Sequence, residues 1–171
     1  MANALAQVWT RAELGMLAPP VMVEVHLSNG MPGLTLVGLP ESAVKESKDR
    51  VRSAMLSAQA EYPTRRLTVN LAPADLPKHG GRYDLPIAIG LLAASGQVPS
   101  KALDQFEWVG ELGLDGSVRE VSGILPIAMS ASAQKRTLIV PKSQMDICSV
   151  VPNLQVLGVD HLSQVIDFLQ N

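Results

Sequence analysis

The chain has 171 residues, of which 47% are hydrophobic and 18% are charged, and its net charge at pH 7 is −2. This length and composition fit one folded domain with a substantial core and exclude a disordered chain. The small negative charge excludes a bulk electrostatic attraction to nucleic acid or membrane, so any basic surface has to be local.

Cysteine use and the apolar pattern indicate the compartment. The single cysteine, Cys148, excludes an internal disulfide and a multi-cysteine zinc site, and it fits a reducing environment. We expect its thiol to be buried as a small hydrophobe. No apolar run approaches the roughly 20 residues that span a bilayer, and the first residues show no export signal. We therefore expect a cytoplasmic protein without a membrane partner.

The first segments of the chain alternate in the way that is typical of strands. Segments 4–14 and 19–30 alternate apolar and other residues, and the second is rich in β-branched side chains. The Ser-Asn-Gly sequence at 28–30 indicates a hairpin turn, and 33–40 is predicted to be a third strand.

A helical period replaces this alternation at Glu41. Apolar residues recur three and four apart and charged pairs lie four apart, which predicts an amphipathic helix of about 18 residues that Pro63 ends. A strand is predicted at 65–73. Asp84 is predicted to cap the next helix, 85–95, which is apolar on nearly every side, so we place this helix in the middle of the core.

Short strands and helices alternate in the second half. The predicted strands are 106–112, 117–121, 137–141 and 153–159, and the predicted helices are 123–134, 142–150 and 161–170. The whole order, β-β-β-α-β-α-β-β-α-β-α-β-α, indicates an α/β or α+β fold with a buried parallel part in the C-terminal half. We find no repeat and no linker, so we treat 1–171 as a single domain.

The motifs that carry nucleotide or hydrolytic chemistry are absent. The chain contains no G-x-x-x-x-G-K-[ST] loop, no G-x-G-x-x-G and no G-x-S-x-G. Its three histidines are isolated in sequence and form no metal-ligand pattern. We therefore predict no catalytic residue, no bound cofactor and no metal site in this chain.

One basic segment is a candidate contact site. Its members are the arginine pair before the strand at 65–73 and the residues around a glycine pair: Arg65, Arg66, Lys78, His79, Gly80, Gly81 and Arg82. The glycines could aim N–H groups at an anion, which suits a phosphate backbone or an acidic partner surface. The alternative is that Arg82 pairs locally with Asp84 or Asp75 in a loop that is merely tight.

Two long stretches carry a family resemblance. "VEVHLSNGMPGLTLVGLPESAVKESKDRVRSAM" and "RRLTVNLAPADLPKHGGRYDLPIAIGLLAAS" resemble the amino-terminal domain of the ComM/YifB, magnesium-chelatase-like, AAA+ ATPase family. This resemblance implies a fold similar to the Lon-protease domain and to domain 2 of a small-subunit ribosomal protein, with a βαβ crossover of the rare left hand. It also implies a downstream AAA+ motor that binds ATP and magnesium.

The resemblance implies a role as well. Members of the family are similar to hexameric DNA helicases that drive branch migration when imported DNA is integrated during natural transformation. DNA and other copies of the protein are therefore the expected partners of the full-length hexamer. The domain itself would serve hexamer assembly, DNA guidance, or both. An alternative is a docking module for recombination proteins, with the helix from Glu41 as a possible contact.

A further resemblance gives a test for peptidase activity. "GELGLDGSVREVSGILPIAMSA" resembles the matching stretch of Lon and of the Lon-like domain of the recombination protein RadA. Lon uses a serine that a lysine activates. Those two positions align near Tyr83 and at Pro126, so both halves of the pair are missing. The rival reading, a peptidase that uses Ser95, Ser122 or Ser130, lacks an activating base, and we predict no peptidase activity.

Overall fold

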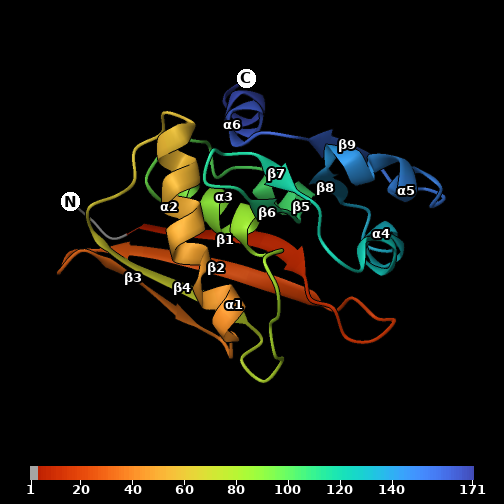
Figure 1. Ribbon diagram of the computed structural model, residues 1–171, viewed down its shortest axis with the longest axis horizontal. Helices are drawn as coiled ribbons and strands as arrows, with labels where there is room; N and C mark the ends of the chain where they lie inside the picture. Colours follow the sequence, from red (N-terminus) through yellow and green to blue (C-terminus); the bar gives the residue numbers. More distant parts are fainter. Residues whose placement is uncertain (1–3) are drawn as a thin grey trace.

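The computed structural model describes residues 4–171 and contains a seven-stranded sheet in the order β3-β4-β2-β1-β5-β8-β9 (Figure 1). The strands are β1 (Ala4–Arg11), β2 (Pro20–Ser28), β3 (Gly33–Val37), β4 (Arg66–Ala72), β5 (Phe106–Trp108), β8 (Thr137–Pro141) and β9 (Val156–Val159). β2 pairs antiparallel with β1 and with β4, and the other four neighbouring pairs are parallel. The predicted α/β class is confirmed, and the parallel part includes the C-terminal strands.

Helices and a small second sheet surround these strands. The helices are α1 (Ser42–Lys45), α2 (Ser47–Ser57), α3 (Asp84–Ala94), α4 (Ile124–Ser132), α5 (Met145–Ser149) and α6 (Leu162–Gln170). Two 3₁₀ turns, η1 (Leu103–Gln105) and η2 (Lys142–Gln144), and the two-stranded sheet of β6 (Glu111–Leu112) and β7 (Val118–Arg119) complete the chain. No helix in residues 4–171 has the length and apolar character that a membrane span needs.

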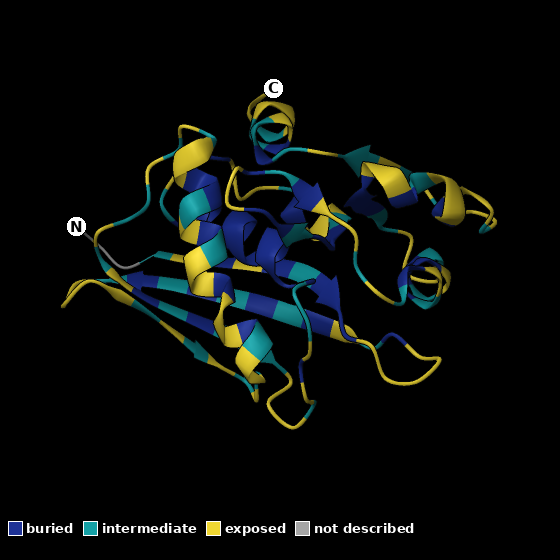
Figure 2. Ribbon diagram, viewed as in Figure 1, coloured by how far each residue is buried: buried dark blue, intermediate teal, exposed yellow. Residues whose placement is uncertain are grey.

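The two faces of the sheet are covered differently. Ile139 belongs to the apolar cluster that contains α2, α3 and α6 residues, whereas Leu138 and Val140 belong to the cluster of α4 and α5. Because neighbouring residues on a strand point to opposite faces, β8 is covered on both sides. β2, in contrast, buries only alternate residues, and β1 does the same up to Thr10, which is buried together with the adjacent Arg11 (Figure 2).

Helix α3 occupies the middle of the core, as predicted. All of its residues are buried. The helix therefore needs no polar face, which explains why its sequence is apolar on nearly every side. Gly90 allows its close approach to the sheet, because a Cβ at this position would lie 2.5 Å from Cγ2 of Val25. The elements around its first turn therefore meet at a buried helix that is packed closely on the sheet.

Two predicted elements are interrupted in the structure. The helix expected from Glu41 is broken at Glu46 into α1 and α2, and it ends at Ser57, before Pro63, because Gln59 has a left-handed φ of 64°. The strand expected at 106–112 divides into β5 and β6, which belong to different sheets. The division lies at Gly110, whose N–H donates to the Arg82 carbonyl at 3.2 Å and whose carbonyl accepts the Leu85 N–H at 3.0 Å. The observed order thus has one strand and one helix more than predicted.

Candidate functional site

Lys78 lies in the loop between β4 and α3, and its buried side chain fastens this loop to neighbouring backbone. Its side chain is fully buried, and Nζ donates to the carbonyl oxygens of Gly38, at 2.6 Å, and of Pro73. Burial lowers the pKa of this lysine. The backbone carbonyl of Lys78 also accepts the Glu41 N–H at 3.1 Å. Lys78 therefore fixes the loop to the end of β3 and does not present its charge at the surface, contrary to the expectation of a contact residue.

Arg82 is also used internally. Only 3% of this residue is exposed, and Nη2 donates to the carbonyl of Ser122 at 2.6 Å and to its hydroxyl at 3.1 Å. Its ion-pair partner is Glu13, at 3.4 Å. The expected local pairing with Asp84 or Asp75 is therefore wrong in its partner, although Arg82 does pair with a carboxylate of the protein itself; its Nη1 is buried without a hydrogen-bond partner among the described residues. Burial lowers the pKa of Arg82.

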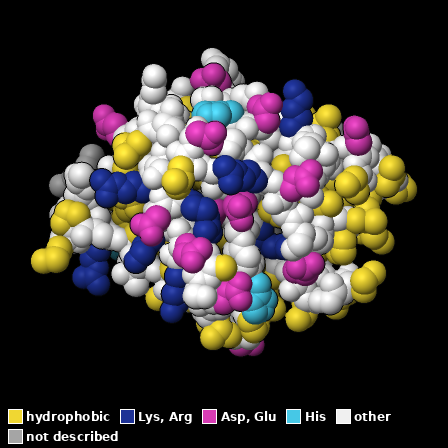
Figure 3. All heavy atoms as spheres, in the orientation of Figure 1, with side chains coloured by type: hydrophobic (Ala, Val, Ile, Leu, Met, Phe, Trp, Pro, Cys, Tyr) yellow, Lys and Arg dark blue, Asp and Glu magenta, His cyan; other side chains and the backbone are white. Residues whose placement is uncertain are grey.

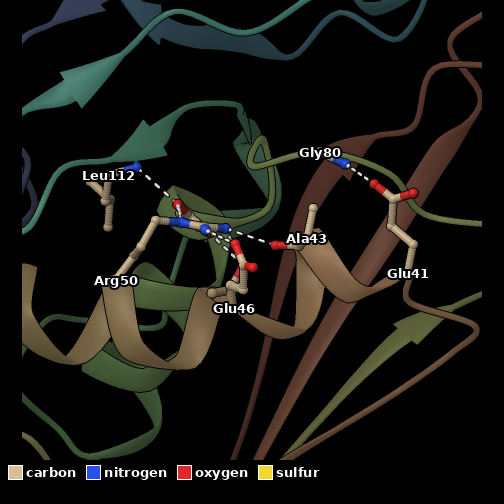
Figure 4. A network of polar contacts seen from close by, with 8 residues as sticks. Glu41, Ala43, Glu46, Arg50, Gly80 and Leu112 are labelled. Carbon is tan, nitrogen blue, oxygen red and sulfur yellow. Dashed lines mark hydrogen bonds and ion pairs between the residues drawn. The ribbon is translucent and has the colours of Figure 1, made fainter.

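One glycine of the pair, Gly80, does bind an anion, and that anion is the carboxylate of the protein's own Glu41. The N–H of Gly80 donates to Oε1 of Glu41 at 2.9 Å (Figure 4). Nδ1 of His79 lies 2.9 Å from Oε2. The hydrogen bond with His79 and then the one from Gly80 lower the pKa of Glu41. A Cβ on Gly81 would collide with the Glu111 carboxylate. The loop at residues 79–81 therefore lies against two carboxylates of the protein itself, those of Glu41 and Glu111.

Asp84 lies at the centre of a buried polar network. It accepts hydrogen bonds from Ser47 Oγ at 2.5 Å, from the Leu112 N–H at 3.0 Å, and from Arg50, whose Nε lies 2.6 Å from Oδ2. Burial is the main influence on its pKa, which is raised, while the bonds from Arg50, Ser47 and Leu112 act in the opposite direction. Figure 4 shows Arg50 reaching into this network from α2.

Asp84 does not cap helix α3 as predicted. The N-cap position is Tyr83, the cap has no side-chain hydrogen bond, and Asp84 is the first helical residue. Its carboxylate instead joins α2, α3 and β6. Ser47 and Arg50 were not predicted as partners of Asp84, because the charged residues of the helix from Glu41 were interpreted only as pairs four apart. The available signal was a carboxylate at the start of a helix without any polar face, since such a buried charge requires a cation.

The remaining basic residues stay closer to the surface. Arg65 is partly buried and donates to Oδ1 of Asn29 at 3.2 Å. Arg66 is exposed at the first position of β4. The structure therefore separates the predicted set: Lys78 and Arg82 lie inside, His79 and Gly80 bind Glu41, and Arg66 is accessible.

Three residues considered for a Lon-like reaction are buried or hydrogen-bonded within the protein: Tyr83, Ser122 and Ser95. Tyr83 is buried, and burial raises the pKa of its phenol, so the side chain stays neutral. Ser122 is bonded to Glu13 and Arg82, and Ser95 to carbonyl oxygens of its own helix. No group of three His, Cys, Asp or Glu residues in 4–171 is arranged to hold a metal. Cys148 is buried as expected, which raises its pKa to about 11.

Comparisons with known proteins agree with the resemblance seen in the sequence. Residues 23–144 match the family model described as subunit ChlI of Mg-chelatase. The chain is 54% identical to competence protein ComM of Haemophilus influenzae over 97% of its length, and 53% identical to protein YifB of Escherichia coli over 98%. It spans 33% of each of these two proteins.

A more distant relative supports the Lon-like fold. The chain is 23% identical to Lon protease 2 of Bacillus subtilis over 89% of its length, which corresponds to 30% of that protein. The two positions that would carry the Lon pair, Tyr83 and Pro126, lie within this chain at the start of α3 and in the first turn of α4.

Proposed function

Because this chain belongs to the family of subunit ChlI of Mg-chelatase, we propose that it is the amino-terminal domain of an AAA+ ATPase that works on DNA. In this proposal the full-length protein is an ATP-dependent helicase that promotes branch migration while imported DNA is integrated. The observation that carries it is the 54% identity with competence protein ComM over 97% of the chain. ATP and magnesium would be bound downstream of residue 171.

The domain itself would be non-catalytic. Tyr83, near the position where Lon is expected to have its serine, is buried and neutral, and Pro126 has no functional group to replace a lysine. The domain would therefore assist the motor by supporting a hexamer, by guiding DNA, or by both. A ring repeats each surface residue once per subunit, so an exposed arginine such as Arg66 would act several times around the axis.

The experiment uses full-length protein and a labelled mobile DNA junction. We expect ATP- and magnesium-dependent movement of the junction, and we expect Arg66→Glu to weaken DNA binding and to reduce its dependence on salt, because a phosphate contact is lost. Lys101→Glu, at another exposed position, makes the same change of charge and is the control. No ATP-dependent movement by the unmodified protein would refute the helicase proposal. Equal losses in both variants would refute a specific role of Arg66.

A further inference from the structure

Strand β3 leaves one side of its backbone unpaired. It forms an edge of the seven-stranded sheet and pairs only with β4 among the described residues. Gly33 donates its N–H to the Arg65 carbonyl at 3.4 Å, so the parallel register directs the N–H and C=O groups of Leu34 and Leu36 away from β4. β3 contains neither a proline nor a charged residue, which commonly protect such edges. This edge is therefore open to a further strand.

A groove lies at the start of this strand. It has a volume of ≈ 580 Å³ and is bounded by the start of β3, by α2 and by residues 62–64. Leu34, Leu56 and Tyr62 supply its apolar lining, and Leu56 is 52% exposed. An exposed leucine next to a partly buried leucine and a tyrosine ring can accept an apolar side chain of a ligand.

The wall of the groove is basic. Lys48 and Arg52 lie one helical turn apart on α2, both are exposed, and neither takes part in any ion pair within residues 4–171. The Arg52 guanidinium lies 5.5 Å from the centre of the Tyr62 ring, which orients it over the groove. Asp49 is the only carboxylate among the lining residues. Figure 3 shows basic side chains over α2 and the neighbouring edge of the sheet, with acidic ones between them.

We propose that this groove binds an extended acidic peptide segment of a partner protein, which adds to β3 as an eighth strand of the large sheet. Backbone hydrogen bonds to Leu34 and Leu36 would hold the segment. Alternate side chains of a strand point to one side, so every second residue of the segment faces α2. Carboxylates at these positions pair with Lys48 and Arg52, and an apolar residue contacts Leu56.

The backbone of the edge favours a peptide over a nucleic acid. Leu34 and Leu36 each offer a donor and an acceptor, and an added strand satisfies both. Phosphate oxygens only accept hydrogen bonds, so a DNA backbone would leave the two carbonyl groups without donors. The excess of two cations, Lys48 and Arg52, over the single lining carboxylate of Asp49 explains the preference for an acidic segment. This site is separate from the helicase proposal, because peptide binding requires neither ATP nor DNA.

The experiment measures binding of a fluorescein-labelled peptide to the 171-residue chain by fluorescence anisotropy. In the probe, two glutamates and one leucine alternate with threonines. We expect saturable binding that Arg52→Glu and Lys48→Glu each weaken about tenfold or more, since like charges then face each other. Lys101→Glu should leave the affinity unchanged. Circular dichroism of each variant confirms that the fold is retained, because these side chains are exposed.

Backbone methylation of the probe tests strand addition directly. Methyl groups on the peptide nitrogens that face β3 should abolish binding, whereas methyl groups on the intervening nitrogens should leave it intact. Equal effects of the two methylation patterns would overturn strand addition. A probe with lysines in place of glutamates should bind more weakly, and equal binding would overturn the acidic preference. Displacement of the probe by double-stranded DNA, together with loss of DNA binding in Arg52→Glu, would instead identify a nucleic-acid site.

Discussion

Arg50 of α2 holds the carboxylate of Asp84 at the start of α3 with two nitrogen atoms, Nε at 2.6 Å from Oδ2 and Nη2 at 3.1 Å from Oδ1. Asp84 is fully buried, while the arginine side chain is 20% exposed. The pair joins two helices that meet at the centre of the fold. Its strength follows from geometry and from the hydrogen bonds that satisfy the remaining carboxylate lone pairs.

We expect Arg50→Met to destabilise the protein by about 3–5 kcal/mol, because it leaves a buried carboxylate without its cation. The double variant Arg50→Met with Asp84→Leu should recover a large part of this loss, since no unpaired charge remains. Urea unfolding of the parent, both single variants and the double variant measures the coupling. Additive effects of the two substitutions would show that the pair contributes nothing beyond its separate side chains.

The contact between Glu41 and the 79–80 loop predicts a pH dependence. The pKa of Glu41 is lowered from an ordinary value of 4.5, mainly by the hydrogen bond with His79 and next by the one from the Gly80 N–H. A lowered pKa means that the contribution to stability is present above 4.5 and is lost as the pH falls through the folded-state value. Glu41→Gln should therefore flatten this part of the stability profile.

Hydrogen exchange at the Gly80 amide localises the effect of Glu41. The parent should lose protection of this amide as the pH falls below 4.5, after correction for intrinsic exchange, whereas Glu41→Gln should show a smaller change. Burial raises the pKa of Asp84, so this residue changes the pH dependence of stability in the opposite sense. Both proteins contain Asp84, and the comparison between them removes its contribution. Identical profiles for the two proteins would contradict the assignment.

Residue patterns predicted the elements better than the partners of the charged side chains. The helical period after Glu41, the apolar helix 85–95 and the buried Cys148 follow from periodicity and composition, and the structure confirms them. One of the charged pairs four apart on this helix, Glu46 and Arg50, forms an ion pair at 3.2 Å, but Arg50 also turns inward to Asp84. Local spacing cannot reveal that second contact, because Asp84 is 34 positions away.

The loop around Gly80 shows the same limit. Basic residues beside two glycines indicate anion binding, and the Gly80 N–H does bind a carboxylate. The carboxylate comes from Glu41, 39 positions earlier, and Lys78 turns toward the carbonyl oxygens of Gly38 and Pro73, which follow β3 and β4. Only the tertiary arrangement of β3 and β4 brings these groups together. The sequence therefore indicated the chemistry of the loop but not its internal partner.

Lys78→Met is expected to lower stability without changing DNA affinity. The substitution removes the donor to the Gly38 and Pro73 carbonyls, and leaving buried polar groups unpaired costs about 1–3 kcal/mol. Thermal unfolding of the 171-residue chain measures the loss, with Lys101→Met as a control on an exposed lysine. DNA binding by the full-length variant should match that of the parent. Weaker DNA binding with unchanged stability would restore Lys78 as a contact residue.

Gly90→Ala tests how tightly α3 packs on the sheet. In a helix interior, alanine is normally more favourable than glycine by about 1 kcal/mol. At position 90, however, the Cβ of alanine would lie 2.5 Å from Cγ2 of Val25. Overpacking of this kind costs about 1–3 kcal/mol, so we expect a net loss of stability in spite of the better helix propensity. Val25→Ala in the same chain removes the clashing methyl groups and should make the added methyl at position 90 neutral or stabilising. Denaturant midpoints of the two single variants and the double variant measure these changes in stability. If Gly90→Ala by itself stabilised the protein, α3 would be able to shift away from β2.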